Sequence, residues 1–154
     1  MRTTEENRIG GLQKELRTRL YETGLQVQVM NAGKQDQVRR TIDGICELIG
    51  FAKLTTIEEE KTLFPSLAIS APFMVSLLEQ EQMRMHEISE KLCISIEQWE
   101  NSISVREKQR LAIMIQFGYN DWMANLLQYL NKQQLLHISA ETEAAETLLE
   151  VVAA

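Results

Sequence analysis

The sequence predicts an all-α protein, an up-down-up-down four-helix bundle that forms a single domain over residues 1–154. Apolar residues recur at the 3.6-residue spacing of an amphipathic helix in four long segments. Each segment ends at a short run containing Asn, Gly, Pro or Ser, and helices joined by short connections pack as antiparallel neighbours. The chain holds only 7 glycines and 2 prolines, too few for the many turns of an all-β domain.

The first helix is predicted to begin at Thr3 or Thr4 and to stop at residues 31–33. Either threonine can cap a helix N-terminus, and the Asn-Ala-Gly run is typical of a helix C-terminus. One face of this helix carries the apolar residues Ile9, Leu12, Leu16, Leu20, Val27 and Met30.

The second helix is predicted over about residues 34–63. Its apolar face consists of Val38, Ile42, Ile45, Ile49 and Ala52. Phe64 precedes Pro65, and the residue before a proline avoids helical angles, so we expect this helix to end there. Residues 65–71 would then form the connection to the third helix.

The third and fourth helices are marked by their end residues. Pro72 fits the first turn of a helix, where its missing N–H costs nothing, and Asn101 stands near the expected end. The fourth helix is predicted to begin near Val105, because Ser104 and Glu107 have the spacing of a capping box. The apolar face of the third helix includes Met74, Leu78, Met85, Ile88, Leu92, Ile96 and Trp99.

Charge and hydropathy narrow the function classes. Lys and Arg number 16 against 22 Asp and Glu, and a net charge of −6 argues against a nucleic-acid binder, which needs a basic face. No apolar run reaches the roughly 18–20 residues of a membrane span. Residues 1–7 lack the apolar core of a signal peptide. We therefore expect a cytoplasmic protein that binds neither nucleic acid nor a membrane.

Several ionisable residues fall on the apolar faces near one end of the predicted bundle. At 100° per residue, Glu60 lies close to the direction of Ile49 on the second helix. The candidates are Glu5, Glu60, Glu81, His137 and Glu141. Alternating helix directions bring these positions to the same end, where carboxylates and one imidazole could bind iron or manganese. Solvent-exposed helix ends explain the same residues without a metal.

Three segments resemble motifs of hemerythrin-like (HHE cation-binding) domains. Residues 58–67, EEEKTLFPSL, resemble the segment that closes the family's second helix, where His-x-x-x-Glu is followed by Leu-Phe-Pro-x-Leu. Pro72 and residues 81–85, EQMRM, resemble the start of the third helix with its Glu-His-x-x-Ile-Arg motif. Residues 136–141, LHISAE, resemble the last motif, His-Ile-x-x-Glu. The resemblance implies a four-helix bundle with a di-iron site.

Most of the family's histidine positions hold other residues in this chain, which has 2 histidines in all. The residues at those positions are Thr56, either Gln82 or Glu81, and either Glu5 or Glu6. Motif alignment places Gln82 inward and helical phase places Glu81 inward, so the choice between them stays open. Only Glu60, His137 and Glu141 match ligands of the family. The resemblance therefore implies a degraded di-iron site, too poor in imidazole to carry oxygen.

The expected function is a non-catalytic regulatory or protein-interaction module that carries no cofactor. Its partner would be an unknown protein or a second copy of the chain. The sequence has no Gly-rich phosphate loop, no Cys-x-x-Cys pair and no His-Glu-x-x-His motif, so an enzyme is not expected. The alternative is a residual carboxylate-rich site, built from the five candidates above, that binds iron or manganese for metal or oxygen sensing.

Overall fold

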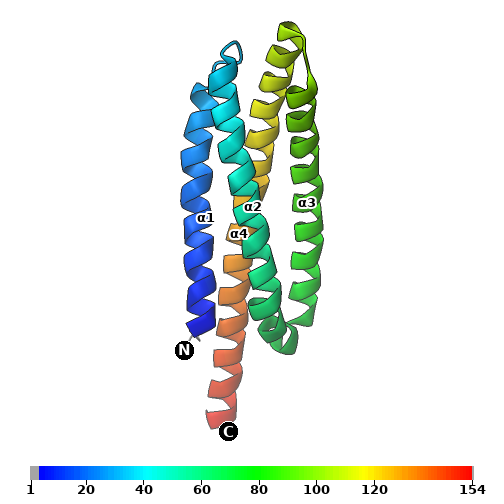
Figure 1. The fold of residues 1–154 in the computed structure, drawn as a ribbon. Coiled ribbons are helices and arrows are strands. Elements are labelled where there is room, and N and C mark those ends of the chain that lie inside the picture. The colour runs from blue at the N-terminus through cyan, green and yellow to red at the C-terminus, as the bar shows by residue number, and fades with distance from the viewer. Residues whose placement is uncertain (1–3, 154) are drawn as a thin grey trace.

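The protein is an all-α, up-down-up-down four-helix bundle, as the sequence predicts. The computed structural model describes residues 4–153, with side chains described for Thr4 and residues 7–134. The helices are α1 (Thr4–Val29), α2 (Gln35–Ser70), α3 (Pro72–Asn101) and α4 (Val105–Ala153). Figure 1 shows that the start of α1, the α2–α3 connection and the end of α4 lie at the same end of the bundle.

Core positions recur every seven residues along each helix. In α2 the series is Val38, Ile45, Ala52 and Glu59, and in α3 it is Leu78, Met85, Leu92 and Trp99, all of them buried. A seven-residue repeat is the pattern of helices that supercoil around one another, with 3.5 residues per turn relative to the shared core. The polar residue Glu59 therefore occupies a position that would ordinarily be apolar.

The α2 helix is longer than predicted and runs through Pro65 to Ser70. Phe64 was the predicted end of this helix because the residue before a proline avoids helical angles, and Pro65 also lacks the N–H that an uninterrupted helix would use. Leu63, Phe64 and Leu67 are nevertheless buried on both sides of the proline. Their burial continues the apolar face of α2 for another turn. The free energy gained by this burial offsets the cost of placing a proline inside the helix. The predicted 65–71 connection is thus wrong, and Ala71 alone separates α2 from α3.

The turn between α3 and α4 has the predicted boundaries. The Ser104 Oγ atom accepts a hydrogen bond from the backbone N–H of Glu107, at 3.3 Å, which is the serine half of the capping box. The Glu107 carboxylate binds Arg110 instead of returning to the cap. Lys108 closes the turn from α4, because its Nζ atom donates to the carbonyl oxygen of Trp99 at 2.8 Å.

The α1 and α4 helices are joined by side chains of α4 that reach backbone groups of α1. The Tyr119 hydroxyl donates to the carbonyl oxygen of Leu20, at 2.6 Å, in the centre of the bundle. Gln116 Nε2 donates to the carbonyl oxygens of Val27 and Met30 at the end of α1. Within residues 4–153, none of the helices contains a stretch both long and apolar enough to cross the hydrocarbon layer of a membrane.

Candidate functional site

A layer of polar side chains crosses the bundle core in the half that lies nearer to the α2–α3 connection. It comprises Gln13 of α1, Glu59 of α2, Gln82 of α3 and Tyr129 of α4, so every helix contributes one residue. We call these four residues the core polar layer. Each stands in the seven-residue series of its helix, for example seven residues before Leu20 or seven residues after Trp122.

Glu59 is the centre of the core polar layer and is only 1% exposed. Its Oε2 atom accepts a hydrogen bond from the Tyr129 hydroxyl at 2.7 Å, and its Oε1 atom accepts one from Gln13 Nε2 at 3.3 Å. Gln82 Nε2 donates in turn to the Tyr129 oxygen at 3.0 Å. The donors therefore form a chain that leads from α3 through α4 to the carboxyl group on α2.

Burial shifts the acidity of both ionisable groups in this layer. Loss of solvation raises the pKa of the Glu59 carboxyl, while the hydrogen bonds from Tyr129 and Gln13 act in the opposite direction. Burial also raises the pKa of Tyr129 far above its ordinary value, and the neighbouring Glu59 charge adds to that shift. The Tyr129 phenol thus stays protonated and serves as a permanent donor.

The prediction that Glu60 points into the core is wrong, because Glu60 is exposed and Glu59 is buried in its place. A straight-helix projection drifts by about 20° per heptad from the seam of a supercoiled bundle. Over the 11 residues from Ile49 to Glu60 this drift amounts to about 30° and carries Glu60 away from the seam, whereas Glu59 stands two heptads after Ile45 and stays on it. Counting in sevens from Ile45 through Ala52 would have identified Glu59 from the sequence.

The same seven-residue count resolves the choice between Glu81 and Gln82. Gln82 stands seven residues before the buried Ser89 and binds Tyr129 inside the bundle. Glu81 is turned toward α4, where Lys132 Nζ lies 3.0 Å from its carboxylate and the Glu81 side chain is 28% exposed. Glu81 is therefore part of a surface ion pair between α3 and α4.

The remaining metal candidates, Glu5, His137 and Glu141, lie outside the described side chains. Among the side chains of Thr4 and residues 7–134, no three His, Cys, Asp or Glu residues form a group that could hold a metal ion. The core polar layer offers one carboxyl group, already engaged by two donors, together with amides and a phenol. This donor set does not fit a di-iron centre, which needs several carboxylates and imidazoles.

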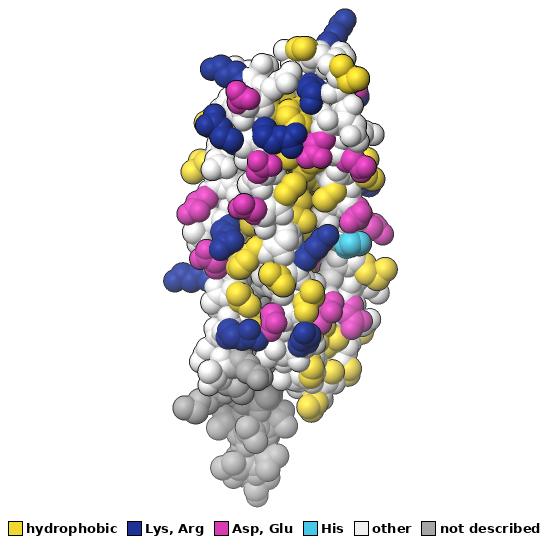
Figure 2. All heavy atoms as spheres, viewed as in Figure 1, with side chains coloured by type: hydrophobic (Ala, Val, Ile, Leu, Met, Phe, Trp, Pro, Cys, Tyr) yellow, Lys and Arg dark blue, Asp and Glu magenta, His cyan; other side chains and the backbone are white. Residues whose placement is uncertain are grey.

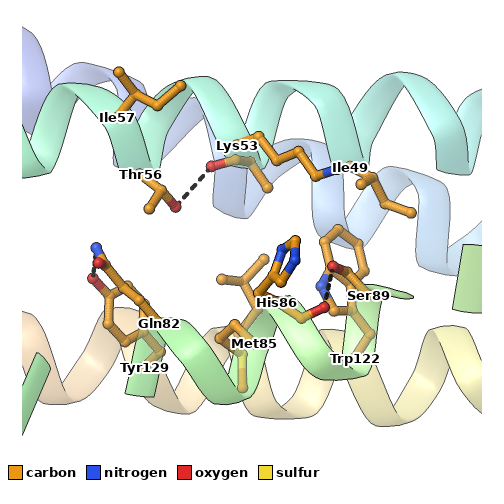
Figure 3. A pocket seen from close by; sticks show the side chains of 12 residues that line it. Ile49, Lys53, Thr56, Ile57, Gln82, Met85, His86, Ser89, Trp122 and Tyr129 are labelled. Carbon is orange, nitrogen blue, oxygen red and sulfur yellow. Dashed lines mark hydrogen bonds between the residues drawn. The ribbon is translucent and has the colours of Figure 1, made fainter. Parts of the chain in front are cut away.

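A cavity of about 290 Å³ opens between α2 and α3 next to the core polar layer. We call it the α2–α3 cavity, and Figure 3 shows its lining side chains. Its apolar wall consists of Ile49, Ala52, Ile57, Met85, Trp122 and Leu126. Gln82 and Tyr129 line it as well, so the cavity and the core polar layer share two residues. In Figure 2 hydrophobic side chains follow the seam between α2 and α3 on the face where the cavity opens.

Polar groups stand at defined places around this cavity. Thr56 lines the cavity, and its Oγ1 atom donates to the carbonyl oxygen of Ala52 at 3.0 Å (Figure 3). Lys53 and His86 line the opening from α2 and α3, and both are exposed. Figure 3 shows the His86 imidazole rising from α3 into the gap between the two helices.

Comparison of the chain with protein-family models, with curated proteins and with solved structures finds no match. The resemblance to hemerythrin-like domains therefore stays a prediction from three short motifs.

Proposed function

We propose that this chain is a non-catalytic binding module without a metal centre, which takes up a small, largely apolar molecule in the α2–α3 cavity. Binding there would bias the packing of α2, α3 and α4 and give the bundle a regulatory role. The single observation that carries the proposal is the cavity of about 290 Å³, open to solvent and walled by apolar side chains of three helices.

The size and lining of the cavity support a small-molecule ligand. Pockets that take such ligands measure about 300–1,000 Å³ and combine apolar walls with a few polar groups. The α2–α3 cavity, at about 290 Å³, lies just below this range and has Thr56 and Gln82 as polar groups beside its apolar wall. Each Å² of apolar surface that a ligand buries there contributes about 25 cal/mol.

The hydrogen bonds and protonation of the core polar layer support a binding function rather than a catalytic one. Glu59 is the one carboxyl in the layer, and both of its oxygens already accept hydrogen bonds. The raised pKa of Tyr129 keeps its phenol protonated, which leaves it unsuited as a base or nucleophile. The layer therefore stabilises the wall of the cavity, and a ligand would meet its amide and phenol groups without reacting.

The proposal is tested with an uncharged apolar dye, N-phenyl-1-naphthylamine, whose fluorescence rises in apolar surroundings. We expect saturable binding to the full chain, quenching of Trp122 emission, and a melting temperature that rises with dye concentration, because a ligand stabilises the folded state that binds it. Thr56→Leu places a larger apolar side chain in the cavity and should weaken dye binding at least tenfold.

Thr18→Leu is the matched control. Thr18 is exposed on α1, and its Oγ1 atom donates to the carbonyl oxygen of Lys14 four residues earlier, as Thr56 does to Ala52. Both substitutions remove the same local hydrogen bond, but only Thr56→Leu fills the cavity. Equal dye affinity in the two variants, or no saturable binding to the wild type, would contradict the proposed function.

A further inference from the structure

Two basic side chains face one another across the opening of the α2–α3 cavity. Arg39 of α2 binds Glu100 of α3 at 3.0 Å and shows how the two antiparallel helices are aligned. Lys53 lies 14 residues after Arg39, and His86 lies 14 residues before Glu100. Lys53 and His86 are therefore opposed in the same register as the ion pair, two heptads further along the seam.

At the first of these two places a carboxylate on α3 faces the basic residue of α2, whereas at the second the residue on α3 that faces Lys53 is His86. No ion pair joins Lys53 to a carboxylate among the side chains that the structure describes. His86 has an acidic neighbour on its own helix, Glu90, with 3.9 Å between Nε2 and the carboxylate. Glu60 stands seven residues after Lys53 on α2, is exposed and is not among the residues that line the cavity. A bound anion between Lys53 and His86 would therefore pair with a basic residue of α2, as Glu100 pairs with Arg39.

We propose that the α2–α3 cavity binds an organic acid with an apolar body, such as a medium-chain fatty acid or an aryl carboxylate. The inference rests on the proposed function and names its ligand class. The hydrocarbon part lies against Met85, Trp122 and Leu126, and the carboxylate lies at the opening between Lys53 and His86. Charge complementarity selects the acid, because the cationic side chain of Lys53 and the basic side chain of His86 both line the cavity.

The exposure of Lys53 and His86 limits how strongly the cavity prefers an organic acid over an uncharged ligand. Charge-assisted hydrogen bonds from an ammonium or imidazolium group to a carboxylate are roughly twice as strong as neutral ones. Both basic groups are exposed, so solvent weakens the attraction, and one such pair changes affinity by about two- to fivefold. The apolar body therefore supplies most of the affinity, while Lys53 and His86 supply the preference for an acid.

The test compares decanoate with decanol, which have the same chain length and differ in charge. Each is titrated calorimetrically into the wild-type chain and into Lys53→Met, with Lys61→Met as a control for the loss of an exposed α2 lysine outside the cavity. We expect decanoate to bind the wild type at least about threefold more tightly than decanol. Lys53→Met should weaken decanoate about two- to fivefold and leave decanol unchanged, and Lys61→Met should change neither. His86→Gln should reduce the preference in the same direction.

The outcomes separate the two proposals. Saturable binding of decanol without preference for decanoate, or equal weakening of both by Lys53→Met, overturns the acid as ligand and leaves the binding cavity standing. Failure of both compounds and of the uncharged dye to bind overturns the proposed function and this inference together.

Discussion

The Tyr129 hydroxyl of α4 donates its hydrogen to the Glu59 carboxyl of α2, with 2.7 Å between the two oxygens. The two residues are 70 positions apart in the chain, and both are at most 3% exposed. The buried Glu59 carboxyl has one partner on α1 and one on α4, so a shift of either helix along α2 would leave it without that partner. We infer that this contact helps to select the register of the bundle.

Removal of the phenolic hydroxyl tests the strength of that contact. Tyr129→Phe leaves the buried Glu59 carboxyl with one hydrogen-bond partner fewer, and an unsatisfied buried polar group costs about 1–3 kcal/mol. We expect a loss of that size in the free energy of unfolding, measured by urea denaturation at neutral pH. Tyr21→Phe, at an exposed tyrosine of α1, should change the stability by less than about 0.5 kcal/mol.

The raised pKa of Glu59 predicts a stability that falls as pH increases. The unfolded chain loses the Glu59 proton near the ordinary value of 4.5, whereas burial makes the folded chain hold it to higher pH. Between pH 4.5 and the pKa of Glu59 in the folded chain, the folded state binds one proton more than the unfolded state. The stabilisation that Glu59 gives the folded state is therefore complete below pH 4.5 and is lost as pH rises through the folded pKa.

Glu59→Gln keeps the shape of the side chain and removes this titration. We measure the free energy of unfolding by urea denaturation from pH 4 to pH 9. The value for Glu59→Gln should increase relative to that of the wild type as pH rises. Glu22→Gln, at an exposed glutamate of α1, should run parallel to the wild type over the same range. Parallel curves for Glu59→Gln and wild type would show that Glu59 titrates as it does in water.

The predicted residual metal site can be tested together with His137. We expect the chain purified without chelators to hold far less than one equivalent of iron or manganese by elemental analysis. Added Mn²⁺ or Fe²⁺ should leave the melting temperature of the wild type and of His137→Ala unchanged, because the core polar layer lacks suitable donors. Stabilisation of the wild type that His137→Ala abolishes would instead establish the carboxylate-rich site.

The α3–α4 turn depends on one lysine. Lys108 Nζ lies 3.9 Å from the centre of the Trp99 ring and also donates to the Trp99 carbonyl oxygen. Lys108→Ala removes a cation–π contact and a helix C-terminal hydrogen bond, and should lower the free energy of unfolding by about 1–2 kcal/mol. Arg106→Ala, two residues away and exposed, should stay within about 0.5 kcal/mol of wild type in the same denaturation experiment.

Two glycines can be replaced to stabilise the bundle. A Cβ atom added at Gly11 or Gly50 meets no atom within 4 Å, so alanine there fits without a clash. Each substitution should raise the free energy of unfolding by about 0.5–1 kcal/mol, since glycine loses more backbone freedom in a helix. Gly24→Ala should raise the free energy of unfolding by less, because the added Cβ atom would lie 3.2 Å from the Met123 sulfur. Thermal unfolding of the three variants gives the comparison.

Sequence reasoning predicted the fold class and most helix ends correctly, because both depend on nearby residues. Capping serines, glycines and a proline in the first turn act within a few positions of the end they specify, as at Pro72 and Ser104. The end of α2 was predicted wrongly at Phe64. There the local cost of Pro65 competes with burial of Leu67 in the core, which is a contact between helices.

The sequence by itself therefore determined four amphipathic helices, their order and their alternation. The tertiary structure decided between two ways of counting along each helix, and it placed Glu59 and Gln82, rather than Glu60 and Glu81, toward the core. Because the packed helices supercoil, the inward positions recur every seven residues, and a straight-helix projection departs from them by about 20° per heptad. The α2–α3 cavity was likewise beyond prediction, because its volume depends on the distance between two helices, which neither helix specifies alone.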